Sequence, residues 1–158
     1  MKTLIAYYSR TGTTKKVAEY LSEKLNCDIE EIVDEKDRSG ALGYIIGGKD
    51  ALQKNLTKIK PLTKNVADFD HVIIGTPVWG HRMAPAVRSF IEKNKKNFKI
   101  ISVFCTMGSS GADQTLKELE ELCEKTATAK FSISTKDVAD AKIKIYAGNF
   151  LENLNKKN

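Results

Sequence analysis

A turn rich in hydroxyl groups follows the first apolar run of this 158-residue sequence. It contains Arg10, Gly12 and four hydroxyl side chains, Ser9, Thr11, Thr13 and Thr14. We expect a strand to end at Tyr8 and a helix to begin within a turn of Gly12. The first backbone amides of a helix have no partner inside it, and the helix dipole adds positive potential there. This turn is therefore predicted to hold a phosphate group.

A simpler interpretation is that Thr13 or Thr14 caps the helix, as threonine often does. A cap needs one hydroxyl, whereas this turn offers four. We favour phosphate binding for that reason, although a cap and a phosphate site can exist together.

The only tryptophan, Trp79, falls in a second loop, which we expect over residues 76–82. Beside a phosphate site its indole could cover one face of a flat ring; the alternative is that it packs the loop onto the body of the protein. Gly80 would let its peptide turn and offer either an N–H or a C=O group to such a ring. His81 could titrate beside the ring or contact a substrate, but it is more typical of a surface residue. Arg82 could equally steer anionic partners or be solvated.

A third loop, residues 106–111, contains Gly108 and Gly111, which allow the backbone to approach a ligand closely. Cys105 precedes it and is predicted to be a small buried apolar residue, because no base partners it. The three cysteines and two histidines are too few and too scattered for a disulfide framework or a zinc site, so no metal is predicted.

The elements that would position these loops alternate strictly between strands and helices. Apolar or alternating runs predict five strands, at residues 3–8, 28–33, 71–75, 99–105 and 130–134. Helical spacing predicts helices over residues 14–25, from Pro85, after Gly111, and from about Val138 to Leu154. Residues 39–56 allow a helix, but four glycines weaken it. Those glycines indicate either close packing or a mobile surface.

This alternation predicts an α/β fold, a doubly wound five-stranded parallel sheet in the order 2-1-3-4-5 with helices on both faces. The order places the continuously apolar strands in the centre and the half-polar strands at the edges. Ligands bind such sheets beyond the carboxyl ends of the strands, where the strand order reverses. The three loops should therefore converge there.

Composition indicates a single domain over residues 1–158, with 41% hydrophobic residues and a net charge of +6. The lysines are spread along the chain, and the clusters at residues 93–99 and 156–157 are predicted to be solvated helix ends, with no nucleic-acid partner. No apolar run approaches the ~20 residues that span a bilayer, so no stable membrane insertion is expected. No secretory signal is evident, which favours a cytoplasmic location.

The six residues from Ser9 to Thr14, together with the Gly-Thr-Pro-Val-Trp-Gly run at 75–80, resemble the flavodoxin family over almost the whole chain. The resemblance implies non-covalently bound FMN. Its phosphate would lie in the first loop, on Ser9, Thr11, Gly12, Thr13 and Thr14, with Arg10 contributing mainly its backbone. Its ring would lie between two groups of residues: Thr76, Pro77, Val78, Trp79 and Gly80 on one side, and Thr106, Met107, Gly108 and Gly111 on the other.

The chain departs from electron-carrying flavodoxins, which are usually strongly acidic and commonly stack a tyrosine from the loop after the fourth strand. Here the chain is basic and that loop has no aromatic residue, although Tyr44 could fill the gap. We predict an electron carrier that works between redox partner proteins. The alternatives are an FMN-dependent oxidoreductase acting with a nicotinamide or a quinone and, less favoured, a non-redox interaction module. The oligomeric state stays open.

Overall fold

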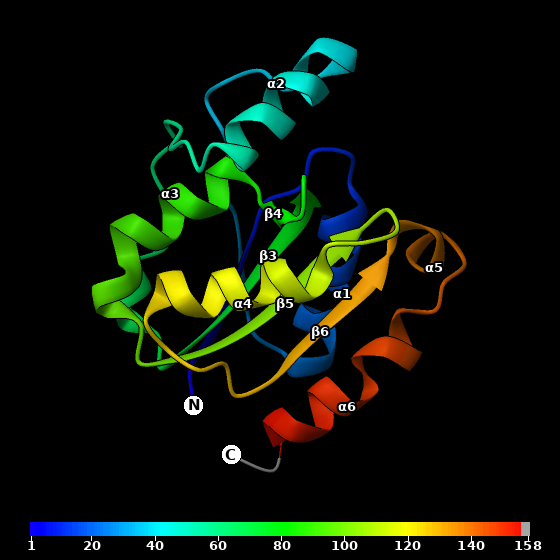
Figure 1. The fold of residues 1–158 in the computed structure, drawn as a ribbon. Helices are drawn as coiled ribbons and strands as arrows, with labels where there is room; N and C mark the ends of the chain where they lie inside the picture. The colour runs from blue at the N-terminus through cyan, green and yellow to red at the C-terminus, as the bar shows by residue number, and fades with distance from the viewer. Residues whose placement is uncertain (156–158) are drawn as a thin grey trace.

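Five parallel strands lie side by side in the centre of the molecule (Figure 1). The computed structural model describes residues 1–155, so the predicted lysine pair at 156–157 lies outside the described residues. The sheet strands are β1 (Thr3–Tyr7), β2 (Asp28–Glu31), β3 (His71–Trp79), β5 (Ile100–Met107) and β6 (Lys130–Ser134). Their order is β2-β1-β3-β5-β6, which confirms the predicted doubly wound arrangement with β2 and β6 at the edges.

Helices cover both faces of this sheet, because alternate residues of the central strands point to opposite sides. Leu4 and Ala6 of β1 join the core beneath α3 (Pro85–Asn94) and α4 (Ala112–Cys123). Ile5 and Tyr7 join the core beneath α1 (Thr13–Leu25) and α6 (Ile143–Asn155). Two short 3₁₀ turns, Val66–Asp68 and Lys95–Asn97, lie in the connections.

The loop predicted at residues 76–82 is mostly strand, which corrects the sequence-based boundary at Gly75. β3 continues to Trp79 and pairs with a two-residue antiparallel strand, β4 (Arg82–Met83), through Val78 opposite Met83 and Trp79 opposite Arg82. The hydroxyl of Thr76 also accepts a hydrogen bond from the amide of Ala84, at 3.0 Å. Only Gly80 and His81 are left to form the turn.

The single helix predicted from Val138 to Leu154 is also wrong, because the structure divides this segment. α5 (Thr135–Ala139) ends before Ala141, whose φ is +58°, and α6 begins at Ile143. Asp137 stabilises the break, since its carboxylate accepts hydrogen bonds from the Ser134 hydroxyl and the Lys142 ammonium group.

Residues 40–52 form helix α2 (Gly40–Leu52), which lies beyond the ends of β3 and β4 (Figure 1). Of the two roles considered for its glycines, close packing holds for two of them. A Cβ atom on Gly43 would meet the backbone of Arg38, and one on Gly47 would lie 2.8 Å from the Trp79 ring. No helix in the described part of the chain is long and apolar enough to cross a membrane.

Candidate functional site

The first loop leaves the N-terminus of α1 without a side-chain cap among the described residues. Gly12 occupies the N-cap position with φ +91°, a conformation that favours glycine. The interpretation of Thr13 or Thr14 as a helix cap is therefore wrong. Gly12 accepts the first helical hydrogen bond, from the amide of Lys16 at 3.0 Å, so the amides ahead of Lys16 point out of the helix end.

The hydroxyls of this turn form a short network of their own. Ser9 Oγ accepts a hydrogen bond from the amide of Gly12 at 3.1 Å, and Thr11 Oγ1 lies 3.4 Å from Thr13 Oγ1. Thr14 is buried, and its hydroxyl lies 2.8 Å from that of Thr106 at the end of β5. The first and third loops are therefore tied together at the sheet edge.

A cavity of about 200 Å³ opens where the three predicted loops meet. Residues from all three loops line it: Ser9, Arg10, Thr11, Thr13 and Thr14; Pro77, Val78 and Trp79; and Thr106, Met107 and Gly108. The convergence that the topology predicts is thus present at one site.

Four of the residues singled out from the sequence do not line this cavity. Thr76 is fully buried and its hydroxyl donates to the carbonyl of Pro77, so it shapes the end of β3 from inside. Gly12 lies within the first turn, and Gly111 forms the N-cap of α4, where a Cβ atom would collide with His81. Gly80 lines a different cavity.

Two lining residues lie outside the predicted loops. Thr135 follows β6, and its hydroxyl donates to the carbonyl of Met107 at 3.2 Å. The rule that parallel strands end at one edge could have indicated Thr135, because β6 is the neighbour of β5. Tyr44 comes from α2, which no strand-end rule places; its ring lies under the guanidinium group of Arg10, 5.2 Å from the Arg10 Cζ atom.

Trp79 lies between the cavity and α2, and only 9% of its surface is exposed. Its ring meets Tyr8 edge-on, with centroids 5.6 Å apart, and packs directly on Gly47. The Arg38 guanidinium lies 5.9 Å from the ring centroid. Trp79 therefore packs β3 against the body of the protein and also forms one wall of the cavity.

A buried ionic cluster holds α2 in this position. Arg38 Nε donates to Asp34 at 2.6 Å, and Arg38 Nη1 donates to Asp50 of α2 at 2.8 Å. Burial opposes ionisation of Asp50, but hydrogen bonds from Lys36, Arg38 and Asn55 outweigh it and lower the pKa of this carboxyl to about 2. The Arg38–Asp50 pair therefore stays charged at neutral pH and fixes the helix beside Trp79.

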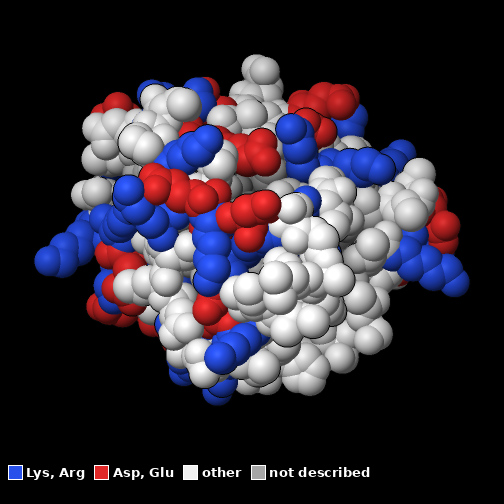
Figure 2. Space-filling view, turned by 90° about the horizontal axis from the view of Figure 1, so that it is seen from above, with Lys and Arg blue, Asp and Glu red and all other residues white. Residues whose placement is uncertain are grey.

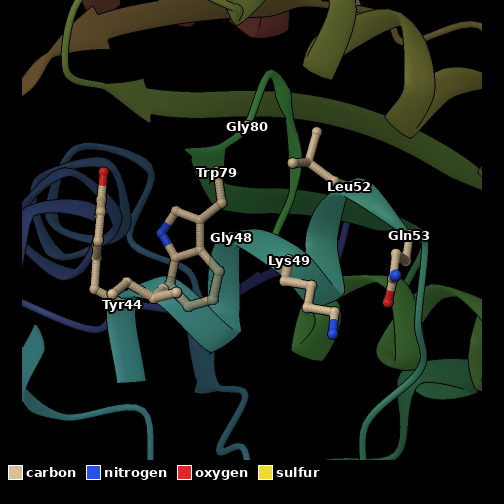
Figure 3. Close-up of a pocket in the computed structure, with 8 residues that line it drawn as sticks. Tyr44, Gly48, Lys49, Leu52, Gln53, Trp79 and Gly80 are labelled. Atoms are coloured by element: carbon tan, nitrogen blue, oxygen red, sulfur yellow. The ribbon is translucent and has the colours of Figure 1, made fainter. Parts of the chain in front are cut away.

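A second, larger cavity of about 530 Å³ lies between α2 and the turn after β3 (Figure 3). It shares Tyr44 and Trp79 with the first cavity, and its other walls are mainly apolar, including Ile45 and Leu52. Figure 3 shows the Tyr44 and Trp79 rings on one side of α2, with Leu52 near Gly80. This cavity could hold an apolar molecule beside a ligand bound in the first cavity.

The turn after β3 is anchored at both ends. His81 Nε2 lies 3.1 Å from Ser110 Oγ in the loop after β5. Glu118 of α4 accepts hydrogen bonds from Arg82 at 2.9 Å and from Arg88 at 2.6 Å. The two loops predicted to flank a ring are therefore held in a fixed relation.

Burial determines the state of Cys105 behind the cavity. The side chain is completely buried, and burial raises the pKa of its thiol to about 12. It therefore remains a neutral thiol, and the absence of a thiolate agrees with the apolar role predicted for it.

Comparison with known proteins identifies relatives of the whole fold. The family model described as flavodoxin matches residues 2–150. A flavoprotein in complex with FMN from Lactobacillus acidophilus NCFM has a similar structure, with a TM-score of 0.69 and 22% identity over 88% of this chain and 97% of that one. A putative flavoprotein from Bacteroides eggerthii has a TM-score of 0.70 and 24% identity over 92% of this chain and 98% of that one. Oxidised flavodoxin 2 from Bacillus cereus has a TM-score of 0.63 and 16% identity over both full chains. No curated protein sequence matches.

Proposed function

This chain belongs to the flavodoxin family, and from that premise we propose that it binds FMN non-covalently and transfers electrons through the bound flavin. The observation that carries the proposal is the uncapped N-terminus of α1 at the same cavity as Trp79 and the end of β5. A similar structure, from Lactobacillus acidophilus, is described as a complex with FMN.

The residues at the cavity fit an FMN phosphate. Outward-pointing amides and the hydroxyls of Ser9, Thr11 and Thr13 can donate to phosphate oxygens, and the helix dipole favours the negative charge. No carboxylate lines this cavity among the described residues, so no negative side chain opposes an anion there.

The two cavity walls fit the flat ring. Pro77, Val78 and Trp79 would border one side, and Thr106, Met107 and Gly108 the other, with Tyr44 at the side of α2. The His81–Ser110 contact and the Arg82–Glu118 ion pair would keep the two walls at a constant separation. When bound, FMN supplies the electron and hydride chemistry, while the chain binds it, orients it and limits its contact with water.

The same site supports a second candidate, an FMN-dependent oxidoreductase that reduces a small apolar acceptor such as a quinone. The cavity of about 530 Å³ favours it, because this space is mainly apolar and adjoins the flavin cavity through Tyr44 and Trp79. An electron carrier that docks only proteins has no need of such a space. The carrier role draws its support from the family and from the absence of a dedicated substrate motif in the sequence.

Two experiments test these proposals in turn. Protein mixed with FMN and desalted should keep an equimolar amount of the flavin; protein that emerges colourless would refute the cofactor. The FMN-loaded protein is then mixed anaerobically with NADH or NADPH, and a quinone is added afterwards. Bleaching by the nucleotide and rapid recovery with the quinone indicates the oxidoreductase. A flavin that ignores the nucleotides but exchanges electrons with a reduced redox protein indicates the carrier.

A further inference from the structure

Helix α2 has its small residues on the inside and its large apolar residues on the outside. Gly43, Gly47 and Ala51 are buried against the protein. Leu42, Ile45 and Leu52 lie on the opposite side of the helix and are 69%, 65% and 59% exposed. Soluble proteins normally show the reverse pattern, so this outer face is suited to contact something other than water.

The charged side chains on α2 and directly after it that remain unpaired are positive. Lys49 lies on the same outer face of α2, between Ile45 and Leu52 in the sequence, and Lys54 follows the helix. The only acidic residue between positions 40 and 60 is Asp50, which is already paired with Arg38 and Lys36. Among residues 1–155, neither Lys49 nor Lys54 forms an ion pair. The outer face therefore combines apolar side chains with uncompensated positive charge.

The face lies at one end of the molecule and borders the larger cavity, because Ile45, Lys49 and Leu52 line that cavity together with Trp79 and Gly80. Figure 1 shows α2 at one end of the molecule, outside the sheet and the helices that cover it. Figure 2 views the molecule from that end, and a broad area without charged side chains lies beside a charged one. At 13 residues the helix is about 20 Å long, enough to lie along a flat surface.

We infer that α2 docks on the surface of a bilayer that contains anionic phospholipids. Leu42, Ile45 and Leu52 enter the boundary between headgroups and acyl chains, while Lys49 and Lys54 contact the anionic headgroups. The chain does not span the bilayer. Because Ile45 and Leu52 also line the larger cavity, docking brings that cavity next to the membrane.

The same observations disfavour the other occupants of this face. In a symmetric contact between two copies, the outer face of one α2 would meet the outer face of the other, which brings the two Lys49 side chains together. The net charge of +6 on each copy adds to the repulsion. A protein partner would have to present acidic and apolar groups matched in position to this face, whereas an anionic bilayer offers both over any flat area.

Sedimentation with sucrose-loaded vesicles tests this inference, with and without FMN. Vesicles of phosphatidylcholine alone are compared with vesicles in which part of it is replaced by phosphatidylglycerol. We expect the FMN-loaded protein to sediment with the anionic vesicles, and raised salt to weaken the binding. Removal of FMN should not change the result, so a failure of the cofactor proposal would remain distinguishable.

Matched variants locate the contact. Ile45→Asn should lower the partition coefficient about tenfold, because it removes an apolar side chain from the bilayer boundary. Ile145→Asn, at a position 75% exposed on α6, should leave it unchanged. Lys49→Gln should weaken binding to anionic vesicles, whereas Lys144→Gln should not. Circular dichroism checks that each variant is folded.

Three results would overturn the inference. The first is wild-type protein that stays in the supernatant with both vesicle compositions, which would indicate a protein partner for this face. The second is equal sedimentation of the Ile45→Asn and Ile145→Asn variants with the wild type. The third is a dimer in analytical ultracentrifugation that the Ile45→Asn variant dissociates, which would assign the face to a second copy.

Discussion

The hydroxyl of Thr14, at the start of α1, lies 2.8 Å from the hydroxyl of Thr106, at the end of β5, and both residues are buried. The contact joins the phosphate turn to one wall of the proposed ring site across the sheet edge. It thus fixes the distance between the two halves of the site before any ligand binds.

Replacing Thr14 with valine should destabilise the protein by about 1–2 kcal/mol, because the Thr106 hydroxyl would remain buried without this partner. Urea denaturation measures the loss. The Thr14→Val/Thr106→Val double variant should lose less than the sum of the two single variants, since no buried hydroxyl is then left unpaired. Strict additivity would show that the contact contributes nothing.

Gly12 and Gly148 form a matched pair, because a Cβ atom meets nothing within 4 Å at either position. Gly12 has φ +91°, so Gly12→Ala should cost about 1 kcal/mol of stability through backbone strain alone. Gly148 lies inside α6, where alanine should stabilise the protein by up to about 1 kcal/mol. Thermal unfolding compares the two, and a shift in the same direction for both would contradict the assignment of strain to Gly12.

Gly47 and Gly48 test the packing of α2 on Trp79. A Cβ atom on Gly47 would lie 2.8 Å from the indole, whereas one on Gly48 meets nothing within 4 Å. Gly47→Ala should displace the ring and shift the fluorescence of the only tryptophan to longer wavelength, while Gly48→Ala should leave the spectrum unchanged. Unaltered emission in both variants would mean that α2 does not press on Trp79.

Stability should fall as the pH is lowered from 6.5 towards 4, because of His71. Burial lowers the pKa of His71 to about 4, and its Nε2 lies 2.9 Å from Ser102 Oγ. Between these pH values the unfolded chain binds a proton at this residue and the folded chain does not, so the free energy of unfolding decreases by about 3 kcal/mol across the window. Urea midpoints at several pH values measure it. A His71→Gln variant that is folded and keeps the same slope would assign the effect to other groups.

The sheet and the meeting of its loops were predictable because they depend on patterns close in the sequence. Continuous apolar runs identified the central strands, and strand order then placed Ser9, Trp79 and Thr106 at one edge. The end of β3 was not predictable, since it depends on pairing with Arg82 and Met83, which follow a turn. The break at Ala141 was missed because the apolar spacing continues through it.

The α2 side of the site was the least predictable part. Its glycines lower helix propensity, and only the contacts of Gly43 with Arg38 and of Gly47 with Trp79 explain their presence. Tyr44 enters the cavity because a buried ion pair between Arg38 and Asp50 fixes the helix there. Such a pair, formed by residues 12 positions apart, leaves no periodic signal in the sequence.

The most direct test of the phosphate turn compares FMN with riboflavin, which has the same ring but no phosphate. FMN-free protein is titrated with each, and quenching of flavin fluorescence gives the two dissociation constants. We predict that FMN binds at least about tenfold more tightly than riboflavin. Thr11→Ala should reduce this difference between the two dissociation constants, whereas Thr126→Ala, at an exposed site elsewhere, should leave it unchanged. Equal affinities for FMN and riboflavin, or no binding of either, would contradict the account.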